Sequence, residues 1–487
     1  MDTQTGQMYF WNNAGASPSP QVVLDVMNNH LQLETLEGGY RAESLARKDV
    51  ENVYHSVAKL VNAPSFEDIA LVESATVAWN RAFYSMANYI LDESIKEAKH
   101  REANGDFNEP LTRIILISEA EYAANVVAIC KYCADQNFRT GDLVQWRLFV
   151  LPSKIITQEK DEGSINAGIV DVDVLERLLS MEESSETLEV LRNHCIKEIS
   201  LNSFSAQEDK SFRVKDVAMV CVTHIPTNSG IINPVNTIGN TISKFNEKRN
   251  LSPPILFLVD ACQSVGQMKV DVQAMHAHAL SATGRKYLRG PRGTGFLYIS
   301  SCISERLTPN EVDHCAAPIV KMNKTENNYN LNIAYKSKAK RFEYWEKSIS
   351  SKLGLGAAIE FSINDIGISN AEKKITALGS LLRKELRNVH GVSIYHDVEN
   401  YSPLCAIVCF SLNGFHPEEI LDYMVKEASH CGRFELSIVP KTSTPFDSMN
   451  TETENLIRAS LSYFNEEQEI REFVSKLKAM IKQLSHS

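Results

Sequence analysis

Short and uniformly apolar runs alternate with longer segments of mixed polarity through the first two thirds of the chain. The runs lie at residues 114–117, 148–151, 218–223, 255–259, 279–282 and 295–299. Strands that are covered on both faces show continuous apolar runs, whereas half-exposed strands alternate. Because the intervening segments are long enough for crossover helices, the pattern predicts an α/β fold around a largely parallel sheet.

Two regions depart from this pattern. Residues 153–216 are rich in Glu, Ser and Asp, for example at 181–186, and we expect a surface excursion with one or two helices. The C-terminal part mixes expected helices at 353–365, 371–389 and 466–484 with strands at 405–410 and 459–463. We therefore predict an N-terminal arm (1–20), a large domain (21–345) that contains the excursion, and a linking helix with a smaller α+β domain (346–487).

Charge and cysteine usage narrow the classes of function. The chain has 487 residues, with 50 Lys and Arg against 61 Asp and Glu, and its net charge is -11. This balance argues against nucleic acid or an anionic membrane as the main partner. No run is long and apolar enough for a membrane span, and the N-terminus does not resemble a signal peptide, so we expect a cytoplasmic protein. The ten scattered cysteines then indicate reduced thiols, and no metal site is expected.

Three segments carry candidate chemistry at places where α/β sheets bind ligands. Asp260 and Gln263 follow one apolar run, and Thr283, Arg285 and Lys286 follow another. The Ser74-Ala75-Thr76 segment precedes a helical pattern, and helix N-termini bind phosphate. A lysine for a Schiff base, an acid for a pyridinium nitrogen and a phosphate cradle are what pyridoxal phosphate requires.

Each of these residues, taken alone, has a simpler explanation. Asp260 suits a turn or a helix cap, and Ser74 suits a helix N-cap. A single lysine is most often solvated at the surface, and a buried tyrosine is most often a core residue. The order and context of the whole set favour the cofactor-binding interpretation.

The segment from Ser281 to Tyr298, SATGRKYLRGPRGTGFLY, resembles the class V aminotransferase family of fold-type I pyridoxal-phosphate enzymes. That family includes cysteine desulfurases, isopenicillin N epimerase-like proteins and the C–S lyases of ergothioneine synthesis. The resemblance runs from Trp11 to about Phe464, apart from the polar excursion. It implies the fold-type I architecture, pyridoxal 5'-phosphate as the cofactor, an amino acid as the substrate and a homodimer.

The resemblance also assigns roles around the cofactor. Lys286 resembles the catalytic lysine that forms the Schiff base and later moves the α-proton. Asp260 matches the acid at the ring nitrogen, and Tyr122 stands where desulfurases stack a histidine on the ring. The remaining cofactor-binding residues contact the ring's phenolic oxygen or the phosphate: Gln263 and Thr227 for the oxygen, and Ser74, Ala75, Thr76, Thr283 and Arg285 for the phosphate.

On the substrate side, Arg458 resembles the arginine that binds the substrate carboxylate. The resemblance further places four residues beside the substrate, namely Asn13, Ala14, Gly15 and Tyr40.

Two departures from the desulfurase pattern bear on the reaction. Desulfurases need a sulfur-accepting cysteine in the small domain, and here the stretch 426–447 offers only Cys431 in unlike surroundings. Desulfurases also follow an Arg-Phe-Glu triplet with a threonine that reaches the partner's phosphate. Here Arg341-Phe342-Glu343 continues with Tyr344-Trp345, so a phosphate contact from the partner is in doubt. For Trp345 two placements stay open: it faces the substrate, or it is a core or interface aromatic residue.

The segment 437–447 resembles ergothioneine-type lyases. The favoured prediction is therefore β-elimination from an S-substituted cysteine or its sulfoxide, similar to hercynylcysteine sulfoxide. An aminotransferase, an epimerase or a cysteine desulfurase is the alternative among enzymes. A catalytically idle family member that binds a partner through the excursion is the alternative outside them.

Overall fold

An eight-stranded sheet forms the centre of the molecule in the computed structural model, which describes residues 7–157, 164–180, 196–200, 212–249, 253–400, 402–426 and 432–484. The five central strands run parallel, and the outer pairings, two at one edge and one at the other, are antiparallel. All six predicted strands are confirmed as members of this sheet. In order across it, the strands are β2 (Ile69–Val72), β11 (Gly295–Ile299), β10 (Ala279–Thr283), β9 (Leu256–Asp260), β8 (Val217–Thr223), β3 (Leu111–Ser118), β4 (Val144–Leu151) and β7 (Lys197–Glu198).

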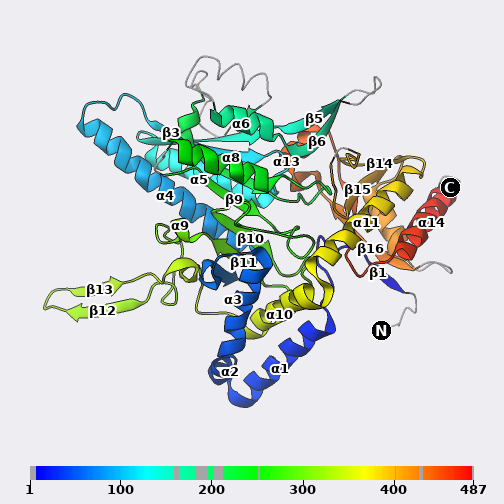
Figure 1. The fold of residues 1–487 in the computed structure, drawn as a ribbon, viewed down its shortest axis with the longest axis horizontal. Helices are drawn as coiled ribbons and strands as arrows, with labels where there is room; N and C mark the ends of the chain where they lie inside the picture. The colour runs from blue at the N-terminus through cyan, green and yellow to red at the C-terminus, as the bar shows by residue number, and fades with distance from the viewer. Residues whose placement is uncertain are drawn as a thin grey trace.

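Helices cover both faces of the sheet, which explains why its strands are apolar throughout (Figure 1). Along β3, Ile114 and Leu116 belong to one hydrophobic cluster, whereas Ile115 and Ile117 belong to the other. One face is covered by α4 (Ala75–Ala103) and α5 (Ala123–Thr140), and the other by α3 (Arg47–Val61), α6 (Val172–Ser180) and α8 (Val235–Arg249).

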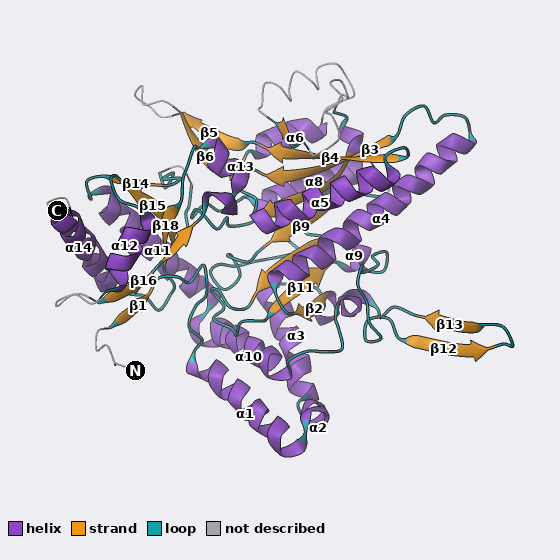
Figure 2. Cartoon of the chain, turned by 180° about the vertical axis from the view of Figure 1, so that it is seen from behind, coloured by secondary structure: helices purple, strands orange, loops and turns teal. Residues whose placement is uncertain are grey.

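A second, antiparallel sheet forms the C-terminal part (Figure 2). Its strand order is β14 (Val392–Ile394), β15 (Ile407–Leu412), β18 (Leu456–Ser460) and β17 (Ser437–Val439). The predicted helices correspond to α10 (Ile349–Glu360), α11 (Ile368–Arg387) and α14 (Glu467–Leu484), and α12 (Pro417–Val425) lies among them in sequence. The division of the chain at residue 345 stays a prediction.

The N-terminal arm crosses to this C-terminal part. Its strand β1 (Met8–Phe10) pairs in parallel with β16 (Arg433–Glu435). The buried Trp11 donates its indole N–H to Glu469 Oε2 at 2.8 Å. The arm therefore joins the start of the chain to its last helix.

Some details of the C-terminal part and the excursion differ from the expectation. The strand expected at 459–463 lies at Leu456–Ser460 instead, because the chain turns at Ser462, whose backbone N–H donates to Asn465 Oδ1. The excursion contains α6, as expected for a helix there, but also a hairpin of β5 (Ser153–Thr157) and β6 (Ser164–Val170) that was not predicted. Residues 181–186 lie outside the described residues.

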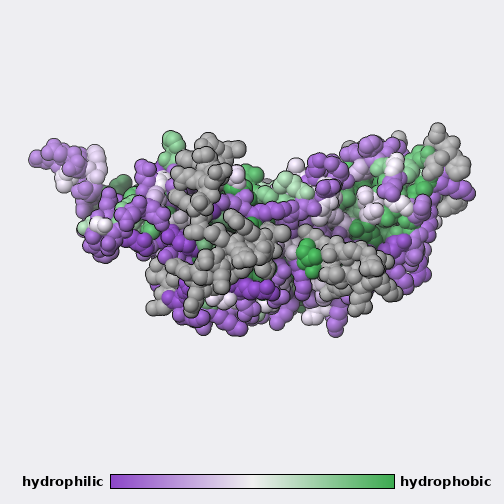
Figure 3. Space-filling model, turned by 90° about the horizontal axis from the view of Figure 1, so that it is seen from above, coloured by the Kyte–Doolittle hydropathy of each residue, from purple (hydrophilic) through white to green (hydrophobic). Residues whose placement is uncertain are grey.

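Further elements without a sequence prediction are α1 (Gln21–Glu37), α2 (Gly39–Leu45) and a second hairpin of β12 (Ile319–Lys324) and β13 (Tyr329–Ile333). This second hairpin projects away from the body, and every residue of both its strands is exposed. Its tip is hydrophilic, whereas hydrophobic side chains gather on the same view towards the C-terminal part (Figure 3). None of the described helices has the length and apolar character to cross a bilayer.

Candidate active site

One pocket at the carboxyl end of the parallel strands gathers all ten residues that the sequence predicts around the cofactor. These are Ser74, Ala75, Thr76, Tyr122, Thr227, Asp260, Gln263, Thr283, Arg285 and Lys286. Four further residues complete the lining, namely Asn125, Thr223, Ile225 and Cys262. The convergence follows from topology, because parallel strands end at the same edge of the sheet.

The N-terminus of α4 forms one wall of this pocket. Ser74 caps the helix, since its Oγ accepts from Val77 N at 3.2 Å, which confirms the simpler explanation for Ser74. The backbone N–H groups of Ala75 and Thr76 belong to the first turn and have no partner within the helix. Such free N–H groups and the positive end of the helix favour a phosphate.

Gly295 lets this helix terminus approach the sheet. A Cβ atom at Gly295 would lie 2.7 Å from Ala282 O and 2.8 Å from the carbonyl carbon of Ser74. No side chain fits in that space, so the glycine sets the position of the cradle. Thr283 lies on the neighbouring strand, where its hydroxyl donates to Thr294 O at 3.3 Å.

The Asp260 carboxylate is held from two sides. Its Oδ1 accepts from Cys262 N at 2.9 Å, and its Oδ2 accepts from Asn125 Nδ2 at 3.1 Å. The same Asn125 amide donates to Glu121 Oε1 at 2.8 Å. This arrangement fixes a carboxylate that faces the pocket, as a protonated ring nitrogen requires.

Glu121 lies behind Asp260 and is completely buried. It accepts from the backbone N–H of Thr223 at 2.9 Å, from the Thr223 hydroxyl at 2.6 Å and from Ser118 Oγ at 2.7 Å. Burial raises the pKa of this carboxyl, and these donors oppose the rise only in part. Sequence reasoning missed Glu121, Asn125 and Thr223, although Asn125 stands one helical turn from Tyr122 and Thr223 ends a predicted strand.

Lys286 is half-buried and lines the pocket. Burial lowers the pKa of its ammonium group below the usual value, and Arg285 and Arg458 add to the effect. Among the described residues, Lys286 Nζ has no hydrogen-bond or ion-pair partner. A lysine in these surroundings carries an accessible lone pair more often than a surface lysine does.

Gln263 and Tyr122 complete the lining. Gln263 donates its Nε2 to Ala14 O at 3.1 Å, and its buried Oε1 has no partner among the described residues. Tyr122 lies at the N-cap of α5, and 39% of its surface is exposed. An unpartnered buried polar atom, a free lysine, a held carboxylate and a helix N-terminus therefore share one pocket, and they fit pyridoxal phosphate.

Arg458 projects from β18 and is buried, and neutral oxygens hold its guanidinium group. Its Nε donates to Ser437 Oγ at 3.0 Å, and its Nη1 donates to Thr227 Oγ1 at 2.7 Å. Its Nη2 donates to Asn12 Oδ1 at 3.3 Å. The guanidinium group is thus oriented by dipoles, and its positive charge stays available for an anion.

The arm residues expected beside the substrate are used in another way. Asn13 is fully buried and donates to Ser460 O at 2.8 Å. The backbone N–H of Ala14 donates to Ser460 Oγ, and Gly15 O accepts from Arg285 Nη1. These contacts fix the arm, and none of the three residues lines the pocket. Their substrate-binding role stays a prediction.

The structure does not bring Tyr40 to this pocket within the same chain. Tyr40 lies on α2, 79% exposed, with its ring centroid 6.5 Å from that of Trp345. Both line a separate cavity of about 890 Å³ together with Tyr54, Lys340 and Glu343. A role of Tyr40 beside the substrate stays a prediction.

Comparisons with known proteins identify the family of the chain. Residues 188–473 match the family model described as Aminotransferase class-V. This match spans more than half of the chain and includes Asp260, Lys286 and Arg458. The chain belongs to the class V aminotransferase family, whose members use pyridoxal phosphate.

Two relatives with curated descriptions are probable cysteine desulfurases. A probable cysteine desulfurase from Methanothermobacter thermautotrophicus is 29% identical over 255 residues, which cover 52% of this chain and 58% of that protein. A probable cysteine desulfurase from Xylella fastidiosa (strain 9a5c) is 22% identical over 480 residues, which cover 96% of this chain and 90% of that protein. The first alignment thus spans little more than half of the relative, whereas the second spans most of both chains.

Solved structures share the fold. The apo cysteine desulfurase from Thermococcus onnurineus NA1 has a TM-score of 0.68 at 18% identity and covers 97% of this chain and 94% of its own. The cystine C–S lyase C-DES, in complex with its reaction product cysteine persulfide, has a TM-score of 0.65 at 16% identity and covers 96% and 97%. The predicted fold-type I architecture, with a large and mostly parallel sheet, is confirmed.

Proposed function

We propose that the protein is a pyridoxal-phosphate-dependent lyase that cleaves the C–S bond of an S-substituted cysteine or its sulfoxide. The observation that carries the proposal is the half-buried, unpaired Lys286 in one pocket with the held carboxylate of Asp260. Arg458 presents an unneutralised positive charge next to this pocket. An amino acid substrate needs a base at its α-carbon and a cation for its carboxylate. Lys286 would supply the base, and Arg458 would supply the cation.

In this proposal, Ala75, Thr76, Thr283 and Arg285 would hold the phosphate at the N-terminus of α4. Asp260 would keep the ring nitrogen protonated, and Gln263 and Thr227 would contact the phenolic oxygen. When bound, the cofactor supplies an electron sink that makes the substrate's α-proton acidic. The lowered pKa of Lys286 increases the share of its amine that is neutral and able to accept a proton.

The reaction balances without an oxidant or a reductant. Lys286 takes the proton from Cα, and the bond between Cβ and sulfur breaks with its electron pair on sulfur. The sulfur leaves as a thiolate, or as a sulfenate from a sulfoxide. The remaining three-carbon enamine takes up water and yields pyruvate and ammonia.

Cysteine desulfurase is the second candidate, and the names of the relatives favour it. That activity requires a thiol that accepts sulfur from the substrate. Cys431 is the only cysteine in the stretch 426–447, and it lies outside the described residues. The cystine C–S lyase C-DES supports the first candidate, because it is a protein of the same fold with C–S lyase activity. A substrate similar to hercynylcysteine sulfoxide rests on the resemblance of segment 437–447 to ergothioneine-type lyases.

The experiment that tests the proposal incubates the cofactor-loaded protein with S-methyl-L-cysteine sulfoxide and, separately, with L-cysteine, without any keto acid. Pyruvate and ammonia in equal amounts, with a persistent visible band of the bound cofactor, are expected from the sulfoxide. Alanine formed from L-cysteine would show desulfuration, and a bleached band would show aminotransfer. Racemised substrate would show epimerisation. If the protein bound no cofactor at all, it would be a catalytically idle family member, and all the proposed enzymatic activities would be refuted.

We further propose a homodimer in the cytoplasm. The projecting hairpin of β12 and β13 supports the dimer, since it exposes Met322, Tyr329 and Leu331 to solvent in the single chain. Exposed apolar side chains in such numbers on one element are typical of an interface. Sedimentation of the purified protein tests this, and a mass of one chain would contradict it.

A further inference from the structure

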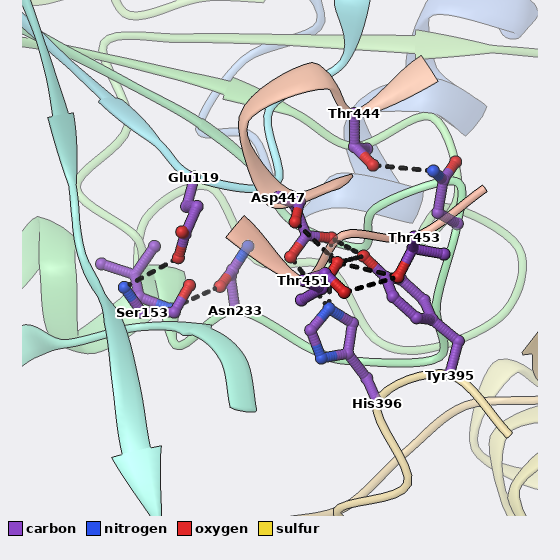
Figure 4. Close-up of polar contacts among 11 residues, drawn as sticks. Glu119, Ser153, Asn233, Tyr395, His396, Thr444, Asp447, Thr451 and Thr453 are labelled. Carbon is purple, nitrogen blue, oxygen red and sulfur yellow. Dashed lines mark hydrogen bonds and ion pairs between the residues drawn. The ribbon is translucent and has the colours of Figure 1, made fainter. Parts of the chain in front are cut away.

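Residues 437–453, called the strap here, comprise β17 and most of its connection to β18, and they lie next to the pocket. The strap contains β17 at its start and the short helix α13 (Pro445–Asn450) near its end. Three sets of hydrogen bonds, called ties here, hold the strap in place. Two of them lie close to the pocket, because their partners are Arg458, which is hydrogen-bonded to the pocket residue Thr227, and Asn228, which follows Thr227. The third tie lies farther away, in a buried polar cluster (Figure 4).

The distant tie is made by Asp447 of α13. Its carboxylate is completely buried and faces the imidazole of His396, with Nε2 2.9 Å from Oδ1 and 3.1 Å from Oδ2. The hydroxyl of Tyr395 donates to Asp447 Oδ2 at 2.9 Å. Burial and the Asp447 charge raise the pKa of Tyr395, so its hydroxyl stays protonated and keeps this bond.

The cluster is closed on its other sides. Thr451 Oγ1 donates to Asp447 O at 2.8 Å and lies 3.0 Å from the Tyr395 hydroxyl. The backbone of Gly168 on β6 packs against the imidazole, because a Cβ there would lie 2.8 Å from both Cε1 and Nε2 of His396. His396 itself holds a left-handed backbone conformation, with φ of 48°. Such a conformation is uncommon outside glycine and persists where the surrounding contacts fix it.

The two near ties connect the strap to Arg458. At the start of the strap, Ser437 Oγ accepts from Arg458 Nε at 3.0 Å. At the N-cap of α13, Thr444 Oγ1 accepts from Asn228 Nδ2 at 2.7 Å, and both residues are buried. Asn228 follows Thr227, whose hydroxyl accepts from Arg458 Nη1. The strap therefore contacts the Arg458 guanidinium group directly at Nε, and it is connected to Nη1 through Asn228 and Thr227.

We propose that Asp447 is a positioning residue, which holds the strap against His396 and Tyr395 and thereby orients Arg458 for the carboxylate of an amino acid. The inference rests on the proposed role of Arg458 as the carboxylate-binding residue. It does not depend on which bond of the substrate is cleaved. Because the partners of Arg458 are neutral, its orientation depends on hydrogen bonds that the strap and the Thr227–Asn228 loop provide, together with one to Asn12 of the N-terminal arm.

The test compares two ligands that differ only in the carboxylate. L-Alanine has no leaving group at Cβ, and ethylamine is the same molecule without the carboxylate. Affinities are measured through the change in the visible band of the cofactor-loaded protein. We expect Asp447→Asn and Thr444→Val to weaken L-alanine binding about tenfold each, in line with the loss of one buried hydrogen bond, and to leave ethylamine binding unchanged.

Lys441→Ala is the matched control. Lys441 also lies on the strap, but it forms an exposed ion pair with Glu454, so its removal is expected to leave both affinities unchanged. If Asp447→Asn fails to fold, Thr444→Val decides the question, because it removes one hydroxyl and keeps the shape. Equal weakening of both ligands, or no weakening of either, would overturn the proposal.

A second measurement asks whether the effect passes through Arg458. In an Arg458→Gln background, Thr444→Val is expected to have no further effect on L-alanine binding, whereas additive effects would contradict the pathway. Hydrogen exchange gives a readout that does not use activity. Peptides from 440–453 should exchange faster in Asp447→Asn than in wild type, and unchanged exchange would contradict the anchor. A wild-type protein that binds L-alanine but forms no pyruvate from S-methyl-L-cysteine sulfoxide would refute the lyase and leave this inference intact.

Discussion

Asn125 Nδ2 donates to Asp260 Oδ2 at 3.1 Å, and this bond joins the start of α5 to the carboxyl end of β9. The same amide also donates to the buried carboxyl of Glu121. One side chain thus separates two acids that would otherwise face each other in a site of low polarity. The orientation of the Asp260 carboxylate therefore depends on a side chain of the neighbouring helix.

The first prediction concerns this asparagine. Asn125→Ala removes one donor from each of the two carboxyl groups, so the protonated ring nitrogen of the cofactor would meet a less well placed acid. We expect the affinity for pyridoxal phosphate to fall about tenfold, measured by titration of the cofactor-free protein in the visible range. Asn370→Ala is the control, since Asn370 is exposed on α11 and its side chain donates to Ile366 O. Equal affinities of Asn125→Ala and wild type would refute the role of Asn125.

The second prediction concerns the close approach of α4 to the sheet. Gly295→Ala places a methyl group 2.7 Å from Ala282 O and 2.8 Å from the backbone of Ser74. We expect the free energy of unfolding to fall by about 1–3 kcal/mol and phosphate-dependent cofactor binding to weaken as well. Denaturant unfolding and cofactor titration measure the two effects.

Gly39→Ala is the matched control for that substitution, because nothing lies within 4 Å of a Cβ at Gly39. It should leave both quantities unchanged. If Gly295→Ala were as stable as Gly39→Ala, the cradle would not depend on the glycine.

The third prediction concerns Arg458. Arg458→Lys keeps a positive charge but loses the planar set of donors to Asn12, Ser437 and Thr227. We expect KM for the amino acid substrate to rise about tenfold or more, with a smaller effect on cofactor affinity. Steady-state kinetics and cofactor titration separate the two. The exposed Arg471→Lys serves as the control, and a KM that stays at the wild-type value in Arg458→Lys would argue against a carboxylate contact.

The fourth prediction concerns acid stability. Burial lowers the pKa of His224 to about 4, whereas the unfolded value is about 6.5. Below about pH 6.5, His224 is protonated in the unfolded chain but stays neutral in the folded chain. The free energy of unfolding therefore decreases as the pH falls towards 4. Between pH 7 and pH 5 this amounts to roughly 2 kcal/mol. His278 acts in the same direction, since burial lowers its pKa to about 4 and its Nδ1 accepts from Phe257 N.

Urea unfolding at the two pH values measures this loss, and His224→Gln should lose less between pH 7 and pH 5 than wild type does. The comparison of variant and wild type isolates His224 from buried acids such as Glu121. The raised pKa of Glu121 acts in the opposite direction, because it reduces stability as the pH rises. An identical pH dependence in variant and wild type would contradict the assignment.

The central sheet and the cofactor pocket were predictable from the sequence for one physical reason. Strands covered on both faces are apolar throughout, and the residues that follow them meet at one edge of a parallel sheet. Asp260, Thr283 and Lys286 occupy such positions, and Ser74 begins the helix that packs against the same edge. Their convergence in one pocket follows from these local signals.

Contacts between segments far apart in the chain were harder to predict from the sequence than the strands and their ends. Glu121 and Asn125 support Asp260 across two strand ends, which no local pattern indicates. Asn13 and its neighbours resemble substrate-binding residues in sequence, but their contacts hold the arm to Ser460. The β12–β13 hairpin was missed although β13 alternates apolar and polar residues, because neither of its faces is buried in the single chain.

The decisive experiment asks which residue carries the cofactor. The protein is loaded with pyridoxal phosphate, reduced with sodium borohydride and digested, and the peptides are weighed by mass spectrometry. We predict that the added mass lies on the peptide that contains Lys286 and is lost in Lys286→Ala. Added mass on a different lysine, or none after loading at saturating cofactor, would contradict the assignment of Lys286.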